Sequence, residues 1–512
     1  MKLALSSQIK TIDSFATESL GIPAQALMGR SGLAVAEALR KIAPQGSKVI
    51  ILAGKGNNGG DGYAAACNLI SDYDVVIIDI FSAGQKTEEG KHYLKEFISL
   101  GGRILPYTPS VHQIISEADV IVDAIFGTGF LGSPPDSLLP LADLVNKSGA
   151  KKIAVDVPLG INADDGSIHD VAIKADLTVA LSYLKPGLLS YPAKEYCAEI
   201  IFDTIGLPRD KVEQSIHFDN FLFDPIEASA ALPERIANSN KGSFGRLLLV
   251  TGSSAYPGAG ILTLEAALRG GAGYVIRVCD STEIGEYVSR FPEAIYCTDV
   301  IRDGSFDIEG IKTLSEKCHS ILIGSGSVES EELAALTEAL IKTEGAPLVI
   351  DASAINALVK YSSRESLRSA KRRIILTPHP LELSRLTGIP LAHIQNNRIS
   401  IAKSFAKEYG VILALKGAAT VTTDGDRLYI NSTGSSALAK AGSGDVLAGL
   451  LASILAYHKD PVVATALAVY LHGRAGDRLS ERLSQYGVTP SDLPIAIAEE
   501  IREIEKNKGA KI

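Results

Sequence analysis

The sequence predicts an α/β fold made of two three-layer α/β/α domains, and three features of the chain support this prediction. Continuous apolar segments that read as buried strands alternate with helical segments, which is typical of parallel sheets covered by helices on both faces. Several of these strands end in glycine-rich loops, where the ligand sites of open parallel sheets lie. The chain has 512 residues, which is too long for a single hydrophobic core.

The first domain is assigned to residues 1–222. Its first helix is expected at 25–42, after Pro23, which suits a helix entry. The strands share a continuous apolar run and are expected at 48–53, 74–80, 119–126, 152–157, 176–181 and 199–202. Helices are expected between them at 63–70, 88–100 and 137–147. A polar, irregular passage near 223–240 marks the boundary between the domains.

The second domain, residues 223–512, shows the same alternation. Its strands are expected at 246–250, 274–278, 320–323, 347–350, 374–376 and 411–415. The Asp424-Gly425 pair predicts a hairpin turn after the last of these strands. Helices are expected at 259–269 and, at the end of the chain, at 446–457, 462–479 and 491–504.

Composition and charge exclude several classes of function. The net charge of -9 argues against a nucleic-acid surface, and the one dense basic run, Lys371–Arg373, is interpreted as the solvated entry of a strand. The longest apolar run, 446–457, is too short to span a bilayer. The five cysteines are scattered, with no CxxC pair, as expected of free thiols in a reducing compartment. Since the start of the chain has no apolar signal segment, we expect a cytoplasmic protein that binds neither nucleic acid nor membranes.

The most informative stretch is Gly442-Ser443-Gly444-Asp445, which leads into an apolar helix. Glycines allow a ligand to approach the backbone closely, and the first turn of a helix offers unpaired N–H groups to a phosphate. A carboxylate would repel that phosphate unless Asp445 is the base that takes a proton from an attacking hydroxyl. The alternative is a helix cap without a ligand, in which Asp445 only stabilises the first turn. The local sequence is compatible with both interpretations.

A second glycine-rich stretch begins at Gly54 and has the G-x-G-x-x-G spacing of a dinucleotide fingerprint. Asp79 lies twenty residues past Gly59, where a ribose-binding carboxylate would lie. The stretch continues to Gly62, which predicts a longer loop and a later helix start, at Tyr63, than that fingerprint has. Its amide and carboxylate oxygens also suit a hard cation or hydroxyl groups. A glycine turn without a ligand is a further alternative.

Other polar residues follow strands and are therefore expected at the same edge of each sheet. Asp123 and Asp156 end two strands of the first domain, beside the glycine-rich loop 127–132. In the second domain His379 lies between two prolines, and Lys416 ends a strand. Each has a structural alternative, as a loop cap, a structural histidine or a solvated lysine. The chain has no G-x-x-x-x-G-K-[ST] motif, so phosphate binding is not expected to be of the P-loop type.

The whole chain resembles the bifunctional NAD(P)H-hydrate repair enzymes, which fuse an NAD(P)HX epimerase to an ADP-dependent NAD(P)HX dehydratase. The resemblance covers nearly all of residues 1–505, and its motifs occur in family order. They are GKGNNGGDG (54–62), DAIFGTG (123–129), LLLVTGSSAYPGAG (247–260), TPHP (377–380), LKGAAT (415–420) and GSGDVLAG (442–449). The resemblance implies an N-terminal Rossmann-like domain and a C-terminal ribokinase-like domain.

The resemblance also implies the roles of individual residues in the epimerase. Asp156 would bind the hydrated nucleotide and act as the acid–base group, and Asn58 and Asp123 would be potassium ligands. Two loops would contact the substrate, namely Asn57, Asn58, Gly59, Gly60 and Asp61, and then Gly127, Thr128, Gly129, Phe130, Leu131, Gly132 and Ser133.

In the dehydratase, Asp445 matches the catalytic residue that also contacts the hydrate. Ala259, Gly326 and His379 match other positions that contact the hydrate, and the ADP site matches Lys416, Gly417, Ala418, Ala419, Thr420 and Gly444. The expected small molecules are NADHX, NADPHX and ADP, or ATP in its place, together with Mg²⁺ and K⁺. A homo-oligomer is expected.

Four positions depart from the family pattern. Leu159 stands where the family has a serine that binds potassium, and Ser325 replaces a proline between two glycines. Leu381 replaces a glycine after His379-Pro380, and Ser353 replaces the second carboxylate of an Asp-Ala-Asp motif. Because Asp156 and Asp445 are both present, we expect both activities to survive.

The expected function is the epimerisation of R- and S-NAD(P)HX, followed by dehydration of the S epimer at the expense of ADP, which gives AMP and phosphate. A small-molecule kinase of the same fold would use the same Gly-x-Gly-Asp loop, but it leaves the first domain unexplained. A nucleotide-sensing module without turnover is a second alternative. A dehydrogenase is a third, although the sequence offers no candidate site for hydride transfer.

Overall fold

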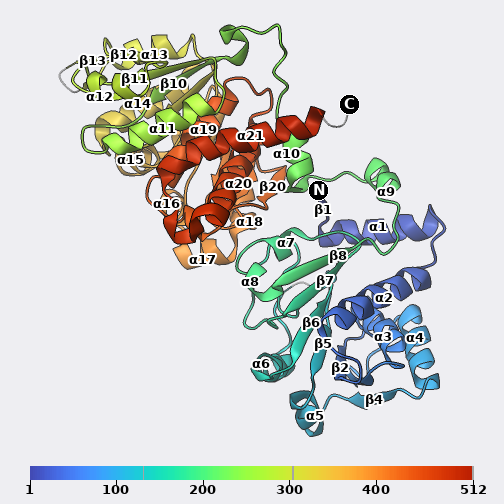
Figure 1. Ribbon diagram of the computed structural model, residues 1–512. Helices are drawn as coiled ribbons and strands as arrows, with labels where there is room; N and C mark the ends of the chain where they lie inside the picture. Colours follow the sequence, from blue (N-terminus) through green and yellow to red (C-terminus); the bar gives the residue numbers. More distant parts are fainter. Residues whose placement is uncertain (131, 303–304, 510–512) are drawn as a thin grey trace. The chain divides into compact units, whose positions relative to one another are not determined.

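The computed structural model describes residues 1–130, 132–302 and 305–509, which fold as two compact units (Figure 1). One unit comprises residues 2–220, and the other comprises Met1 and residues 221–512. The division falls beside the polar passage that suggested a domain boundary. None of the helices in the described part of the chain is both long and apolar enough to cross a membrane.

The first unit contains a seven-stranded, wholly parallel sheet with the strand order β4-β3-β2-β5-β6-β7-β8. Its strands are β2 (Lys48–Ala53), β3 (Asp74–Asp79), β4 (Arg103–Pro106), β5 (Val120–Ala124), β6 (Lys151–Val155), β7 (Leu177–Leu181) and β8 (Glu199–Asp203). Its longer helices are α1 (Ser6–Glu18), α2 (Ala24–Ile42), α3 (Asn57–Leu69), α4 (Glu88–Ser99), α5 (His112–Ser116), α6 (Leu139–Lys147) and α9 (Arg209–Ser215), and its single-turn helices are α7 (Pro186–Leu189) and α8 (Lys194–Cys197).

Both faces of this sheet are buried, as the continuous apolar runs predicted. Along β2, Val49 and Ile51 belong to one apolar cluster, which also contains residues of α1, α2 and α3. Ile50 and Leu52 belong to a second cluster, with residues of α5 and α6. Successive side chains of a strand point to opposite faces of the sheet. Each cluster is therefore the apolar core between the sheet and one of the two helix layers of the predicted architecture.

The second unit has the strand order β9-β20-β19-β18-β17-β16-β15-β10-β11-β12, parallel from β18 to β12. Its strands are β9 (Asn220–Phe223), β10 (Arg246–Val250), β11 (Tyr274–Val278), β12 (Ile295–Cys297), β15 (Ser320–Ile323), β16 (Leu348–Ile350), β17 (Ile374–Leu376), β18 (Ile412–Leu415), β19 (Val421–Thr423) and β20 (Leu428–Asn431), with a separate ribbon of β13 (Ile301–Arg302) and β14 (Ser305–Phe306).

The helices around this sheet include the predicted C-terminal set. They are α10 (Pro225–Ala231), α11 (Pro257–Arg269), α12 (Ile284–Arg290), α13 (Ile308–Ser315), α14 (Glu331–Lys342), α15 (Ser353–Tyr361), α16 (Pro380–Thr387), α17 (Leu391–Asn396), α18 (Arg398–Tyr409), α19 (Ser443–Leu455), α20 (Pro461–Gly487) and α21 (Leu493–Gly509). Helix α19 is buried along almost its whole length, as its continuous apolar sequence predicted.

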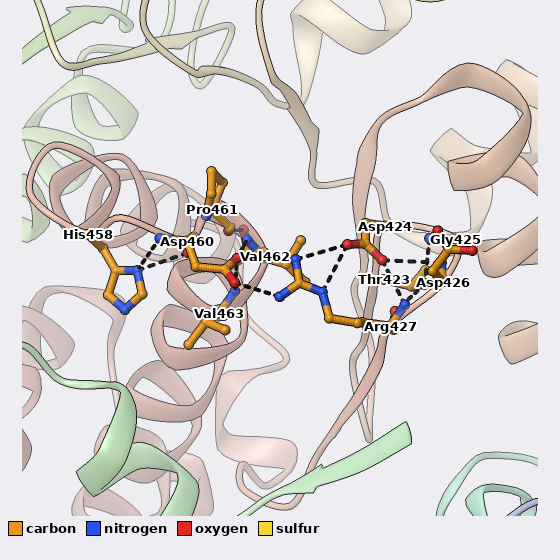
Figure 2. Close-up of polar contacts among 11 residues, drawn as sticks. Thr423, Asp424, Gly425, Asp426, Arg427, His458, Asp460, Pro461, Val462 and Val463 are labelled. Atoms are coloured by element: carbon orange, nitrogen blue, oxygen red, sulfur yellow. Dashed lines mark hydrogen bonds and ion pairs between the residues drawn. The ribbon is translucent and has the colours of Figure 1, made fainter. Parts of the chain in front are cut away.

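The predicted Asp-Gly hairpin is confirmed, since β19 pairs antiparallel with β18 and β20. Figure 2 shows how its turn is tied to helix α20. Arg427 Nη2 donates to Asp424 Oδ2 at 3.0 Å and to Asp460 Oδ1 at 3.3 Å. Asp460 also caps α20 by accepting from Val462 N at 3.0 Å. The arginine therefore links the hairpin turn to a helix N-terminus.

Two expectations about polar segments of the chain were wrong. The passage near 223–240 contains α10, whose start Asp224 caps by accepting from Ile226 N and Glu227 N, both at 2.9 Å. Arg372, expected to be solvated, is only 7 % exposed. Its guanidinium donates to the carbonyls of Thr343, Glu344 and Ala346, just past the end of α14, where a cation is favourable.

Candidate active sites

A cavity of about 570 Å³ lies at the carboxyl ends of the strands in the first unit. Loops that follow β2, β5, β6 and β7 line it, together with one side of α1. The expected residues that reach the cavity are Asn57, Asn58, Asp61, Gly127, Thr128, Gly129, Phe130 and Asp156. Gly132 and Ser133 are exposed and do not line it, and Leu131 lies outside the described residues.

The glycines of the first loop serve close packing rather than a long flexible loop. Helix α3 begins at Asn57, so the expected helix start at Tyr63 was wrong. A Cβ at Gly59 would lie 2.0 Å from Gly54 O, and one at Gly62 would lie 2.7 Å from Ala124 Cβ. Gly60 is packed in the same way against Met28. Gly59 is therefore buried against the end of β2 and Gly60 against α2, and they hold their neighbours at the cavity.

Asp156 forms a buried ion pair with Lys185, a residue that sequence reasoning missed. The Asp156 backbone has a φ of 65°, a left-handed conformation that is uncommon outside glycine and often found at functional sites. Its Oδ1 accepts from Lys185 Nζ and from Leu181 N. Lys185 is 1 % exposed and also donates to Leu181 O at 2.7 Å. The lysine thus fixes the position of the Asp156 carboxylate.

Two more carboxyl groups share this cavity. Asp61, in the first turns of α3, hydrogen-bonds Ser31, and desolvation together with the charges of Asp156 and Asp13 holds its pKa well above the usual range. Asp13 comes from α1, a helix that the sequence analysis did not predict. Desolvation raises the pKa of Asp13 to about 6, against the opposing effect of Lys185.

The two expected potassium ligands fit a cation. Asn58 Nδ2 donates to Phe126 O at 2.8 Å, while its Oδ1 is buried and accepts no hydrogen bond from the described residues. Asp123 is 1 % exposed, and among the described residues no cationic side chain pairs with it. Its oxygens accept from Ile125 N at 3.2 Å and Leu159 N at 2.7 Å. An amide oxygen without a donor and a buried carboxylate without a counter-ion are the groups that a hard cation satisfies.

Leu159 contributes no side-chain ligand to such a cation. Its side chain belongs to the apolar cluster beneath β2 and β5. Its carbonyl accepts from Ile173 N at 2.9 Å, which leaves one lone pair. Asp79, the residue at the ribose position of the dinucleotide fingerprint, is paired with Lys86 Nζ at 2.8 Å and does not line the cavity.

In the second unit, a buried carboxylate organises the carboxyl ends of the parallel strands. Asp351, directly after β16, is 1 % exposed. It accepts from Ser325 Oγ at 2.8 Å, Thr377 Oγ1 at 2.7 Å and Lys416 Nζ at 3.1 Å. Ser325, which replaces the family's proline, thus donates to this carboxylate. Asp351 joins the loops after β15, β17 and β18 into one site.

Lys416 lies among three acidic side chains. Its ammonium is 3.1 Å from Asp351 Oδ1 and 3.9 Å from Glu382 Oε2, and the charges of these two residues and of Asp445 raise its pKa against desolvation. A Cβ at Gly444 would lie 3.6 Å from Lys416 Nζ. The lysine therefore lies between the strand-end carboxylates and the glycine loop.

His379 begins helix α16 and faces Glu382 across a capping box. His379 N donates to Glu382 Oε2 at 2.8 Å, and Glu382 N donates to the His379 ring at 3.1 Å. The ring is half-buried, and its pKa is lowered chiefly by desolvation. Glu382 itself is 4 % exposed and was not singled out from the sequence. His379 is thereby fixed beside Lys416.

The glycine loop has the geometry of an anion site with an adjacent carboxyl group. Gly442, with a φ of 101°, precedes α19, and no side chain caps that helix. Asp445 is within the first turn instead of at the cap position, so a role as N-cap does not explain it. Desolvation raises its pKa to about 6, assisted by the charge of Asp351 and opposed by that of Lys416. A carboxyl group with this pKa can exchange a proton near neutral pH.

The loop Lys416–Thr420 rests on a buried arginine. Gly417 has a φ of 136° and Ala419 a φ of 51°. Arg398, 5 % exposed, donates through Nη2 to Leu415 O at 3.2 Å and to Lys416 O at 3.3 Å. Gly417 and Ala418 are exposed, so a ligand can reach their backbone.

The remaining expected hydrate contacts also lie together. A Cβ at Gly326 would be 2.5 Å from Ala259 Cβ, which comes from the start of α11. Gly326 has a φ of 67°, so both its backbone and its close approach to Ala259 favour glycine. The second site therefore brings together Ala259, Gly326, His379, Lys416, Gly444 and Asp445, whose roles in binding and catalysis stay predictions.

Two family models match this chain. Residues 24–187 match a model described as YjeF-related protein N-terminus, and residues 247–499 match NAD(P)H-hydrate dehydratase. The bifunctional NAD(P)H-hydrate repair enzyme Nnr of Moorella thermoacetica is 32% identical over 99% of this chain and 98% of its own length. Its Escherichia coli counterpart is 32% identical over 93% of this chain and 90% of its own.

One solved structure is similar to part of this chain. The ADP/ATP-dependent NAD(P)H-hydrate dehydratase of Bacillus subtilis, co-crystallised with ATP and Mg²⁺, has 30% sequence identity and a TM-score of 0.48. The match covers 55% of this chain and 98% of that protein.

Proposed function

The chain belongs to the family of bifunctional NAD(P)H-hydrate repair enzymes, and on this premise we propose how each unit acts. The second unit dehydrates S-NADHX and S-NADPHX to the reduced cofactors while ADP is converted to AMP and phosphate. The first unit interconverts the R and S epimers of the same hydrates. The observation that carries the proposal for the second unit is the carboxyl group of Asp445, which lies in the first turn behind a glycine loop and interacts electrostatically with Asp351 and Lys416.

Asp445 acts as the general base of the dehydratase. It takes the proton from the hydroxyl of the hydrated nicotinamide ring, and the oxygen attacks the terminal phosphoryl group of ADP. The phosphate ester then loses phosphate, and loss of a proton from the neighbouring carbon regenerates the ring double bond. The sum is hydrate plus ADP to reduced cofactor, AMP, phosphate and a proton. A pKa of about 6 for Asp445 keeps its carboxylate available at neutral pH.

The other residues of the second site position the reactants. The N–H groups at the start of α19 and the ammonium of Lys416 offset charge on the moving phosphoryl group. The backbone of Lys416–Thr420 holds the nucleotide, and Ala259, Gly326 and His379 contact the hydrate. Mg²⁺ supplies further charge neutralisation when it is bound with the nucleotide. Since the described residues contain no cluster of three metal-binding side chains, the phosphates of the nucleotide are expected to hold most of its ligand positions.

In the first unit, the Asp156–Lys185 pair binds the hydrate and handles its proton, and the loops at Asn57–Asp61 and Gly127–Phe130 contact the rest of the nucleotide. Asn58 and Asp123 would hold a potassium ion, which would fix the start of α3 against the end of β5. The buried Asn58 Oδ1, which accepts no hydrogen bond from the described residues, supports this assignment. The epimerase supplies the S form that the dehydratase consumes.

We also propose that the protein is a cytoplasmic homo-oligomer. All five cysteines are free thiols, which is compatible with a reducing compartment, and the oligomer follows from the resemblance. Sedimentation analysis of the purified protein tests the oligomeric state, and a single species at the monomer mass contradicts a homo-oligomer.

The proposed function is tested with the full chain and separated R- and S-NADHX. With ADP and Mg²⁺, S-NADHX should give stoichiometric NADH, AMP and phosphate, and R-NADHX should react only through prior epimerisation. A phosphorylated product that accumulates without NADH would instead identify a small-molecule kinase. Tight binding of both ligands without turnover would identify a nucleotide-sensing protein.

A further inference from the structure

Helix α1 forms a wall of the epimerase cavity, although it lies outside the stretch that the family model matches. That model begins at residue 24, whereas α1 spans Ser6–Glu18. Its apolar residues Ile9, Ile12 and Ala16 pack into the core of the unit. Asp13 and Thr17 line the cavity from the same helix. The helix is therefore anchored by its core-facing side and contributes a carboxyl group to the site.

The four acidic side chains that line this cavity differ in whether their carboxyl groups are already engaged by other protein groups. They are Asp13, Asp61, Glu89 and Asp156. Asp156 is paired with Lys185, and Asp61 hydrogen-bonds Ser31 and has a pKa well above its usual range. Within the described part of the chain, the carboxyl group of Asp13 has neither a hydrogen bond nor an ion pair. It is nevertheless close enough to Asp156 and Lys185 to interact with both electrostatically.

Glu89 differs from Asp13 in its surroundings. It lies in the first turn of α4, where the helix dipole favours a negative charge. It is absent from the charges that perturb Asp13 or Asp61. Glu89 therefore does not contribute to the electrostatic surroundings of Asp13.

We propose that Asp13 is the second acid–base group of the epimerase, acting opposite the Asp156–Lys185 pair. This inference rests on the proposed epimerase activity. Hydration of an enamine places the hydroxyl on the carbon next to nitrogen. Inversion at that carbon requires the C–O bond to break with a proton delivered to the leaving oxygen, while the nitrogen lone pair forms the iminium bond.

Water then adds to the opposite face of the planar carbon and loses a proton, which restores the hydroxyl with inverted configuration. One water leaves and one returns, and one proton is consumed and one released, so the exchange needs no oxidant or other reactant. Because the two steps occur on opposite faces of the ring, a single fixed carboxylate cannot serve both. The free carboxyl group of Asp13 supplies the second position.

The charged groups around Asp13 allow it to change protonation state near neutral pH. Besides Asp61, Glu89, Asp156 and Lys185, the cavity contains Lys10 and Lys55. Desolvation outweighs the favourable charge of Lys185 and raises the pKa of Asp13 to about 6. Such a group can donate and accept a proton within one catalytic cycle.

The test compares Asp13→Asn, Asp13→Glu and the control Glu18→Gln in the full chain; Glu18 ends the same helix, is exposed and does not line the cavity. Conversion of R- to S-NADHX is followed by chromatographic separation of the epimers. Loss of a general acid–base group predicts a roughly 10²–10⁴-fold slower epimerisation in Asp13→Asn, partial recovery in Asp13→Glu, and a rate within about twofold of wild type in Glu18→Gln. Dehydration of S-NADHX by the same preparations should be unchanged.

A structural role of Asp13 predicts a different pattern. In that case Asp13→Asn would lower both the epimerisation rate and the melting temperature of the first unit. The residual epimerisation would still show the limb of the pH profile near pH 6. Either this pattern or an Asp13→Asn rate within threefold of wild type overturns the inference and leaves the epimerase assignment intact. A wild-type protein that does not interconvert the epimers at all overturns the proposed epimerase function itself.

Discussion

Replacing Asp351 with Asn removes the charge that joins the loops of the second site. The Asp351 carboxylate accepts from Ser325, Thr377 and Lys416 and is 1 % exposed. An Asn side chain of the same shape keeps one acceptor oxygen but turns an NH₂ group towards these donors. It also leaves the largely buried Lys416, whose side chain is 19% exposed, with a more distant carboxylate, Glu382, at 3.9 Å.

The magnitude follows from the burial of the pair. Removing one partner of a buried ion pair costs about 3–5 kcal/mol. For a domain of this size, about 2–4 °C of melting temperature is lost per kcal/mol. We therefore expect Asp351→Asn to melt roughly 6–20 °C lower. Ser325→Ala or Thr377→Ala, which each remove one hydrogen bond to a charged group, should each cost about 1.5–3 kcal/mol.

Calorimetry of the full chain measures these shifts, with Asp426→Asn as the control. Asp426 pairs with Lys407 on the surface, with side chains 76% and 72% exposed, so its loss should cost about 0–1 kcal/mol. Asp351 also raises the pKa of Asp445, so the acidic limb of the dehydration rate should move to lower pH in Asp351→Asn. If this variant melts within 2 °C of wild type and keeps the same limb, the role assigned to Asp351 is wrong.

Three further predictions concern the two sites. The ionised form of Asp445 is the base, and its pKa is raised to about 6. The dehydration rate should therefore be independent of pH above 6 and fall tenfold for each pH unit below it. A dehydration rate that does not change between pH 7 and pH 4 would contradict this role of Asp445. Arg398→Lys should raise the KM for ADP roughly tenfold, because the hydrogen bonds to the carbonyls of Leu415 and Lys416 are lost. Arg372→Lys, at the end of α14, should leave this KM unchanged. An equal rise of the KM in the two variants would refute a specific role of Arg398 in holding the nucleotide loop. Epimerisation should be faster in KCl than in NaCl of equal ionic strength, and Asn58→Leu should abolish the difference; a difference that survives in this variant would exclude Asn58 as a ligand.

The sequence was sufficient for the architecture because both sheets are buried on two faces. Such strands read as continuous apolar runs, and β2 and β18 were found in this way. Helix α1 was missed because its apolar residues Ile9, Ile12 and Ala16 are sparse among polar ones. Helix α3 was placed too late because its glycines were interpreted as loop residues, whereas each lies where another chain segment approaches too closely for a side chain.

The sites were predicted in part, for a related reason. Residues in glycine-rich loops at strand ends, such as Asn58, Lys416 and Asp445, carry a local signal. Lys185, Glu382 and Arg398 lie in stretches without such a signal, and only the tertiary structure brings them to Asp156, Lys416 and the nucleotide loop. Asp351 ends a strand like Asp156, but its partners come from three separate loops.

The central claim is that Asp445 activates the hydroxyl that leaves as phosphate. The most direct measurement is the recovery of NADH absorbance from S-NADHX and ADP by Asp445→Asn, with wild type and the epimerase activity of the same preparation as controls. Loss of a general base predicts a roughly 10²–10⁴-fold lower rate, with epimerisation unchanged. A variant that regenerates NADH at the wild-type rate would contradict the mechanism.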